Sequence, residues 1–267
     1  MLGLPRSKKV LIGVVHLAAT PGSPRFAGDP AAIVRRAVKD ARVLAGCGCD
    51  ALIVENFGDV PFFAGSVPAE TVASLALALA AVIDVARGKP VGVNVLRNDA
   101  RAALGLCAAT GARFVRINVH VGAAVTDQGL IQGDAASTLR ERARLCPEVE
   151  LLCDVHVKHA QPLGGGSLES AALDTLRRGL ADVLIVSGTA TGDAPEASDV
   201  ERVRSCTGGA ALLVGSGVDE RNTHALLSHA DGAIVGTSLK RGGEVREPVD
   251  AARVERLRRA FDAVKEA

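Results

Sequence analysis

The chain has 267 residues, of which 48% are hydrophobic and 23% are charged. It is too apolar to be disordered and too short to require a second domain, so we expect one globular domain over residues 1–267. The 31 Lys and Arg residues nearly balance the 30 Asp and Glu residues. A net charge of +1 excludes the strongly basic surface that binds nucleic acid or anionic membranes, and it favours a local small-molecule site.

Short runs of Val, Ile and Leu recur along the chain, as is typical of strands buried on both faces of a parallel sheet. Segments with helical spacing lie between these runs, and several end in the glycine that favours a helix C-terminus. The expected strands are residues 10–15, 50–55, 91–96, 113–119, 150–157, 182–187, 211–215 and 232–236. The clearest expected helices are residues 31–46, 69–88, 99–111 and 218–229.

Eight strand–helix units in about 250 residues predict an α/β fold, a single (β/α)8 TIM barrel. An open doubly wound sheet is the alternative. That fold would carry G-x-G-x-x-G after its first strand, where this chain has V-V-H-L-A-A-T-P-G-S-P. The most apolar helical stretch, residues 75–85, is too short and too rich in Ala to cross a bilayer, so we expect no membrane insertion.

The six cysteines follow an N-terminus that lacks the pattern of a secretory signal peptide. This combination predicts a cytoplasmic protein whose cysteines are free and pack as small apolar residues. Cys47 and Cys49 have the spacing of half a metal site, but no second Cys or His pair lies at finger-like spacing.

Polar residues close the first five apolar runs, which is where a TIM barrel builds its active site. Alternation along a strand places Asp154, His156 and Lys158 on one expected inward face. Burying ionisable groups costs roughly several kcal/mol unless each is paired, so they indicate a functional site. The alternative is a closed salt-bridge network that pairs Asp154 with Lys158 or Glu55 with Arg116. The expected substrate-binding residues are His16, Asn56, Asn94, Arg97, Asn98, Arg116 and Asn118.

Four of these strand-end residues are the expected catalytic groups: Glu55, Asp154, His156 and Lys158. Glu55 or Asp154 would act as the acid and base, and Lys158 would stabilise negative charge or form a Schiff base. Because Asp154, Glu55 and a substrate phosphate would all favour its charged form, we favour Lys158 as a permanent cation.

Two glycine loops close the last two strands, V-G-S-G-V at residues 214–218 and V-G-T-S-L-K at residues 235–240. Many TIM barrels bind phosphate at this place through backbone N–H groups and nearby hydroxyls. The alternative is that the glycines only form tight turns. The expected phosphate-binding residues are Gly215, Ser216, Gly217, Gly236 and Thr237.

A divalent metal is a further possibility at His16, Glu55, Asp154 and His156, because carboxylate and imidazole bind Mn, Zn or Fe. The H-x-H motif of metal-dependent barrel hydrolases is absent from the first strand. We therefore expect no metal site and no required cofactor, and we keep a divalent metal as an alternative.

Four of the six phenylalanines, Phe26, Phe57, Phe62 and Phe63, lie in the loops expected after the first two strands. A scarce residue type concentrated in loops favours an apolar lid over the site. A plug under a long loop and a subunit contact are equally compatible with this pattern.

The motifs together resemble the BtpA family, barrel proteins of bacteria and archaea that take their name from a photosystem I assembly factor and include SgcQ-type proteins of sugar operons. The resemblance covers about Ile12 to about Val254. It implies a ribulose-phosphate-binding type of TIM barrel, which agrees with the phosphate loops. The motifs are H-L-A-A-T-P-G-S-P-R from His16, E-N-F-G-D-V-P-F from Glu55, G-V-N-V-L-R-N-D from Gly92, F-V-R-I-N-V from Phe114, T-D-Q-G-L-I-Q-G from Thr126, D-V-H-V-K-H from Asp154, G-S-G-V from Gly215 and V-G-T-S-L-K from Val235.

Two functions are compatible with these features. The first is an enzyme that acts on a phosphorylated sugar or nucleotide-like small molecule by acid/base chemistry, as a lyase, an isomerase or a glycosidic-bond hydrolase. The second is a non-catalytic assembly or stability factor for a membrane complex of the photosystem type, as the family's name suggests. Such a factor needs no rim of ionisable residues. We also expect a homo-oligomer that binds no nucleic acid.

Overall fold

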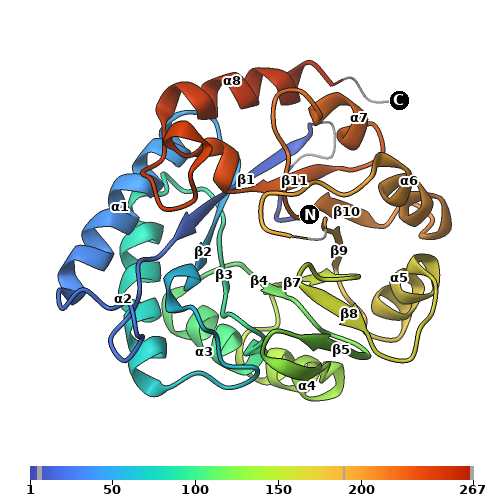
Figure 1. The fold of residues 1–267 in the computed structure, drawn as a ribbon, viewed down its shortest axis with the longest axis horizontal. Helices are drawn as coiled ribbons and strands as arrows, with labels where there is room; N and C mark the ends of the chain where they lie inside the picture. The colour runs from blue at the N-terminus through green and yellow to red at the C-terminus, as the bar shows by residue number, and fades with distance from the viewer. Residues whose placement is uncertain (5–7, 189, 265–267) are drawn as a thin grey trace.

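The structure is a computed structural model that describes residues 1–4, 8–188 and 190–264, and its main feature is a closed barrel of parallel strands (Figure 1). Each strand of this barrel is hydrogen-bonded to the next, and β11 pairs with β1 to close it. This confirms the predicted (β/α)8 barrel. The barrel strands are β1 (Val10–His16), β2 (Ala51–Glu55), β3 (Val91–Asn94), β4 (Phe114–Ile117), β7 (Glu150–Asp154), β9 (Val183–Val186), β10 (Ala211–Val214) and β11 (Gly232–Val235).

The helices form a ring around the barrel (Figure 1). Aspartates cap the first turns of four of them, since the side chains of Asp29, Asp99, Asp134 and Asp250 accept backbone N–H groups there. No helix within the described ranges is long and apolar enough to cross a membrane. The α-helices are α1 (Pro30–Gly46), α2 (Ala69–Val85), α3 (Ala100–Thr110), α4 (Ala135–Leu145), α5 (Leu168–Arg177), α6 (Ala197–Cys206), α7 (Thr223–Leu227) and α8 (Ala251–Asp262), and the 3-10 helices are η1 (Phe57–Asp59), η2 (Thr237–Leu239) and η3 (Arg241–Gly243).

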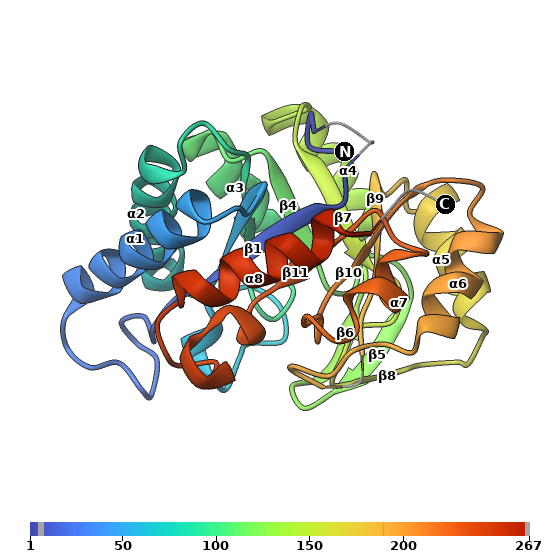
Figure 2. The ribbon, with the colours of Figure 1, turned by 90° about the horizontal axis from the view of Figure 1, so that it is seen from above.

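A small antiparallel sheet, not predicted from the sequence, lies at one end of the barrel (Figure 2). It consists of β5 (Ala123–Thr126), β6 (Gly129–Gln132) and β8 (Ala160–Pro162). The first two strands are inserted between β4 and α4, and the third follows β7. The strand expected over residues 150–157 therefore ends at Asp154, and alternation along a strand does not extend to the residues beyond it.

The inside of the barrel is divided into an apolar layer and a polar layer. Leu2 packs against the apolar layer, at the end where the strands begin. Gly92 makes room there for Phe114, whose ring lies 2.3 Å from where a Cβ on Gly92 would stand. The polar layer lies at the other end of the strands. The apolar layer consists of Val10, Ile12, Val14, Ala51, Ile53, Phe114, Leu152, Val183, Ile185, Leu213 and Ile234.

A buried ion pair ties α1 to the segment that follows β11. The ammonium of Lys240 donates to Asp40 Oδ2 at 2.9 Å, and both side chains are almost completely buried. The other oxygen of Asp40 accepts the backbone N–H of Val249 at 2.9 Å. The pair thus positions the turn that leads from the second glycine loop to α8.

Replacing Lys240 by Met should lower the free energy of unfolding by about 3 kcal/mol, because it leaves the Asp40 carboxylate buried without its charge partner. Urea unfolding followed by circular dichroism measures this loss. The matched control is Lys39→Met on the exposed side of α1, which should change stability by less than about 0.5 kcal/mol. Equal stability of the two variants would contradict the anchoring role of the pair.

Candidate active site

Arg116 on β4 lies at the centre of the polar layer, with only 3% of its side chain exposed. Its Nε and Nη2 donate to Asp154 Oδ2 at 2.9 Å and to Oδ1 at 3.0 Å. The carboxylate of Glu55 lies 3.6 Å from Arg116 Nη1. Burial alone lowers the pKa of Arg116, but the two carboxylates outweigh it and raise that pKa. Arg116 is therefore a fixed positive charge inside the barrel.

Asp154 at the end of β7 is occupied by internal hydrogen bonds. Besides the guanidinium of Arg116, it accepts Asn118 Nδ2 at 3.0 Å and the hydroxyl of Ser187 at 2.8 Å. Its side chain is fully buried. With both oxygens held in this way, Asp154 is better placed to orient Arg116 than to exchange protons with a substrate. The salt-bridge alternative paired Asp154 with Lys158, whereas Asp154 pairs with Arg116 in the structure.

Glu55 at the end of β2 has one oxygen held and the other more open. Its Oε1 accepts Asn94 Nδ2 at 3.2 Å. Its Oε2 lies 3.9 Å from His16 Nε2, which is too far for a hydrogen bond. Of the two expected acid/base carboxylates, Glu55 is therefore the one with an oxygen available to a ligand.

His16 at the end of β1 is a buried histidine kept neutral by its surroundings. Burial lowers its pKa well below the usual value, and nearby positive charges lower it further. Its Nδ1 has no hydrogen-bond partner among the described residues. The ring of Phe57 packs on the imidazole, with the ring centres 4.5 Å apart. The cations that act on it are Lys240, Lys158, Arg36 and Arg116.

The two glycine loops and the ionisable cluster line one cavity of about 320 Å³, the barrel-mouth cavity. All five expected phosphate-binding residues lie on its wall, as do Arg221 and Arg253, which the sequence reasoning did not identify. The expected residues that share this wall are His16, Glu55, Arg116, Lys158, Gly215, Ser216, Gly217, Gly236 and Thr237.

The glycines of these loops are also required by internal packing. A Cβ on Gly236 would lie 2.6 Å from His16 Cε1, and one on Gly217 would lie 2.1 Å from the backbone nitrogen of Ala194. Gly217 also has a φ of +72°, which favours glycine. The hydroxyl of Ser216 donates to the backbone oxygen of Asp193 at 2.8 Å, so it is not a free donor in this arrangement.

Lys158 reaches the barrel-mouth cavity from the loop after β7 rather than from a strand face. Burial lowers its pKa to about 8, and the positive charges of Arg116 and Arg97 act in the same direction. The two carboxylates expected to keep it charged, Glu55 and Asp154, still raise its pKa, but both also lie against Arg116. The expectation of a permanent cation is therefore too simple, because a substantial neutral fraction exists near pH 8.

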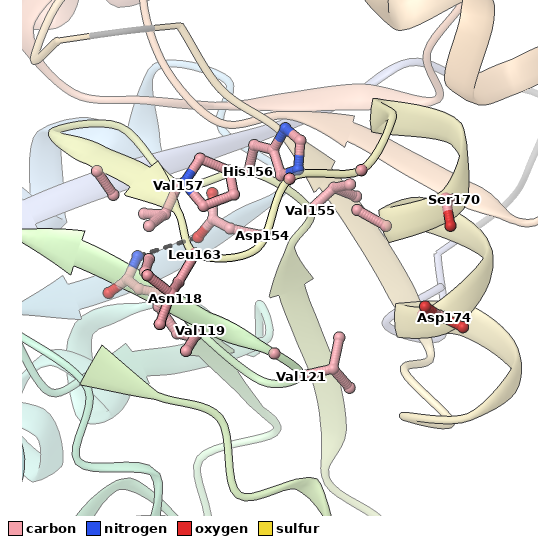
Figure 3. A pocket seen from close by; sticks show the side chains of 18 of the residues that line it. Asn118, Val119, Val121, Asp154, Val155, His156, Val157, Leu163, Ser170 and Asp174 are labelled. Atoms are coloured by element: carbon pink, nitrogen blue, oxygen red, sulfur yellow. Dashed lines mark hydrogen bonds between the residues drawn. The ribbon is translucent and has the colours of Figure 1, made fainter. Parts of the chain in front are cut away.

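The structure separates His156 from this cluster. It lies two residues beyond the end of β7, and it lines a second cavity of about 310 Å³ beside α5 (Figure 3). Asn118 and Asp154 lie on the wall of this side cavity, and the Oδ1 of Asn118 has no partner among the described residues (Figure 3). His156 thus shares a cavity with Asp154 but not with Lys158, so the single inward face expected for the three residues is wrong.

Three of the expected substrate-binding residues make hydrogen bonds that hold loops together. Asn56 binds the backbone nitrogen and oxygen of Leu96, and Asn98 binds those of Val119. Arg97 Nη2 donates to the backbone oxygen of Lys158 at 2.5 Å. Asn56 and Asn98 connect loops that follow neighbouring strands, and Arg97 connects the loop after β3 to the loop after β7.

The possible metal set is not assembled either. His16 and Glu55 line the barrel-mouth cavity, whereas His156 lines the side cavity and Asp154 is bound to Arg116. Within the described ranges, no group of three or more His, Cys, Asp or Glu side chains is arranged to hold a metal ion.

Of the four loop phenylalanines, Phe57 packs against His16 and Phe26 packs against the core. Phe63 is 56% exposed. The four rings therefore do not act as one unit, and the lid expected from their clustering is not seen.

Ser187 is the main site residue that the sequence reasoning did not name, and it bridges Asp154 and Arg116. It directly follows β9, and it continues the inward face of Val183 and Ile185. The rule that polar residues at strand ends form the site would have identified Ser187 as well.

The fold is shared with TIM barrels of known structure. Thiamine phosphate pyrophosphorylase from Pyrococcus furiosus superposes with a TM-score of 0.59 at 12% identity, covering 96% of this chain and 97% of that one. Phosphoribosyl anthranilate isomerase from Thermus thermophilus gives a TM-score of 0.58 at 10% identity, covering 95% and 98%. At these identities the likeness shows the fold alone.

Within this class the chain belongs to the BtpA family, whose pattern it matches over residues 7–263. The photosystem I biogenesis protein BtpA of Synechocystis is 45% identical over 244 residues, which is 91% of this chain and 85% of that protein. The resemblance inferred from the sequence motifs is therefore confirmed.

The lowered pKa of Lys158 gives a direct test of the site. Labelling with acetic anhydride across a pH series should show the reactivity of Lys158 rising with a midpoint near pH 8, because only the neutral amine reacts. Mass spectrometry reports each lysine, and Lys39 on the exposed side of α1 serves as the control. A midpoint near pH 10 for Lys158 would show that its ammonium is stabilised in the site.

Proposed function

We propose that this chain is an enzyme that acts on a phosphorylated sugar or nucleotide-like small molecule in the barrel-mouth cavity. The observation that carries the proposal is that both glycine loops open onto the same cavity as Glu55, Arg116 and Lys158. A phosphate held by the loops would thus present the rest of its molecule to a carboxylate and two cationic groups. A buried cluster of this kind is typical of an active site.

The phosphate would bind to backbone N–H groups of the two loops. The amides of Ser216, Gly217 and Thr237 have no hydrogen-bond acceptor among the described residues. Arg221 and Arg253 add positive charge on the same wall, although Arg221 is already paired with Asp219 at 2.6 Å. Backbone amides together with guanidinium groups are a common setting for phosphate.

Glu55 would move the proton, since its Oε2 is the more open carboxylate oxygen of the cluster. Neutral His16 beside it would help to position the substrate. Lys158 would stabilise developing negative charge in its ammonium form or, in its neutral form, attack a carbonyl to give a Schiff base. Isomerisation, aldol-type cleavage and glycosidic-bond hydrolysis are all compatible with these groups.

The alternative role is a non-catalytic assembly factor, which the name of the Synechocystis relative suggests. A docking role needs an exposed surface and gains nothing from Arg116, Glu55 and Asp154 buried inside the barrel. Burying such charges is costly, and a functional site justifies the cost better than a docking surface does. The enzyme proposal is therefore preferred.

Inorganic phosphate should bind to the protein, and Gly236→Val should abolish this binding, because branched side-chain atoms would enter the space next to His16. Phosphorus NMR line broadening measures the binding. Gly105→Val is a matched control in α3, where a Cβ meets no atom within 4 Å. Phosphate that binds equally well to both variants would refute the assignment to the loops.

Glu55→Gln should lower kcat about 100-fold or more on the phosphorylated compound that the enzyme turns over, while phosphate binding persists. The substrate would come from a panel of sugar phosphates and nucleotides assayed by mass spectrometry. The control is Glu148→Gln, an exposed residue that precedes β7 at the far end of the barrel. Full activity of Glu55→Gln would assign the proton transfer elsewhere.

Reduction with borohydride during turnover separates the two roles of Lys158. A stable adduct on Lys158 would establish a Schiff base, whereas substantial residual activity of Lys158→Arg would establish a cation.

A further inference from the structure

A third cavity, of about 590 Å³, adjoins the barrel-mouth cavity, and we name it the arginine cavity. His16, Thr191, Thr237 and Gly243 line both cavities, so the two lie side by side. The arginine cavity extends from these shared residues over the loops that follow β1 and β2. Its cationic lining residues are Arg25, Arg36 and Arg246.

The floor of the arginine cavity is a tightly built pair of loops. A Cβ on Gly58 would lie 2.3 Å from the backbone nitrogen of Ala19, so the two loops are in direct backbone contact. Asp59 accepts the backbone N–H of Thr20 at 2.7 Å and its hydroxyl at 2.9 Å. The floor is therefore preorganised, which lowers the entropic cost of binding a ligand there.

Arg36 on α1 has one N–H donor that lacks an acceptor. Its Nη2 donates to the backbone oxygen of Arg246, which ties the helix to the segment after η3. Its Nε is buried and has no acceptor among the described residues. An unsatisfied buried donor on a guanidinium is costly, and an anionic ligand in the cavity would satisfy it.

The three arginines are not neutralised by the protein. None of them has a carboxylate within 4 Å in the described part of the chain, and Glu244 is the one carboxylate on this cavity's wall. The two adjacent cavities together are lined by seven Lys or Arg side chains and three carboxylates, although the whole chain has a net charge of only +1. Positive charge is thus concentrated at the barrel mouth.

We propose that the arginine cavity binds a second anionic group, a phosphate or a carboxylate, of the same substrate molecule whose phosphate is held by the glycine loops. This inference rests on the proposed function and narrows its substrate to a small molecule with negative charge at both ends. The reacting centre then lies between the two anions, next to His16 and Glu55. Holding both ends orients it against Glu55 and Lys158.

The test uses linear alkanediol bisphosphates of three to six carbons and the matching alkyl monophosphates, with inorganic phosphate as the reference. Calorimetry at low ionic strength should show that one of the bisphosphates binds roughly tenfold more tightly than its monophosphate, because a second charge-assisted contact is made. The carboxylate source is tested with the corresponding phosphorylated alkanoic acids. A preference for these acids over the bisphosphates would identify the second group as a carboxylate.

Arg36→Gln should remove the affinity advantage of the bisphosphate, so that the bisphosphate and its monophosphate bind with equal affinity. Arg246→Gln, an exposed substitution, should give the same result if Arg36→Gln is unstable. The matched control is Arg35→Gln, the neighbouring exposed residue on α1, which is paired with Asp29 at 2.7 Å and does not line the cavity. Arg35→Gln should keep the full affinity advantage of the bisphosphate over its monophosphate.

The outcomes separate this inference from the function on which it rests. Equal affinity of bisphosphates and monophosphates for the unaltered protein would overturn the second anion site while leaving the phosphate loops intact. An advantage that survives both Arg36→Gln and Arg246→Gln would also overturn it. No binding of inorganic phosphate or of any probe would refute the phosphate loops and the second site together.

Discussion

The bidentate pair between Arg116 and Asp154 is the interaction on which the rest of the site depends. A guanidinium and a carboxylate buried inside a barrel are costly to desolvate, and the cost is offset only when their hydrogen-bonding groups are occupied. Asn118 and Ser187 complete the shell of Asp154, and Glu55 approaches the other side of Arg116. These side chains come from the ends of four strands, β2, β4, β7 and β9, so the charge cluster assembles only when the barrel brings these strands together.

The barrel could be predicted from the sequence because its strands are runs of buried β-branched residues at regular intervals, which is the physical signature of a parallel sheet. The three-stranded sheet could not be predicted, because β5, β6 and β8 are short and carry exposed residues such as Val125 and Leu130. Their pairing depends on the loops being brought together by the barrel. Short strands with mixed burial give no periodic signal of their own.

The inward-facing residues of the candidate site were predictable only where alternation along a strand holds. His16, Glu55, Arg116 and Asp154 all lie on strands and all form the polar layer. His156 lies beyond the end of β7, where backbone direction is set by loop contacts, and it faces another cavity. The hydrogen-bond partners of Asn56 and Asn98 are backbone groups of adjacent loops, and no spacing rule in the sequence specifies such contacts.

The protonation state of Lys158 depends on its burial and its charged neighbours, and not only on which residues the site contains. Asp154 was expected to keep the Lys158 ammonium charged, but its carboxylate is hydrogen-bonded to Arg116. The positive charge of Arg116 in turn lowers the pKa of Lys158. A phosphate in the glycine loops would supply the missing negative charge and would favour the protonated lysine. Whether Lys158 acts as a cation or as a nucleophile thus depends on how close the substrate's own charge comes to it.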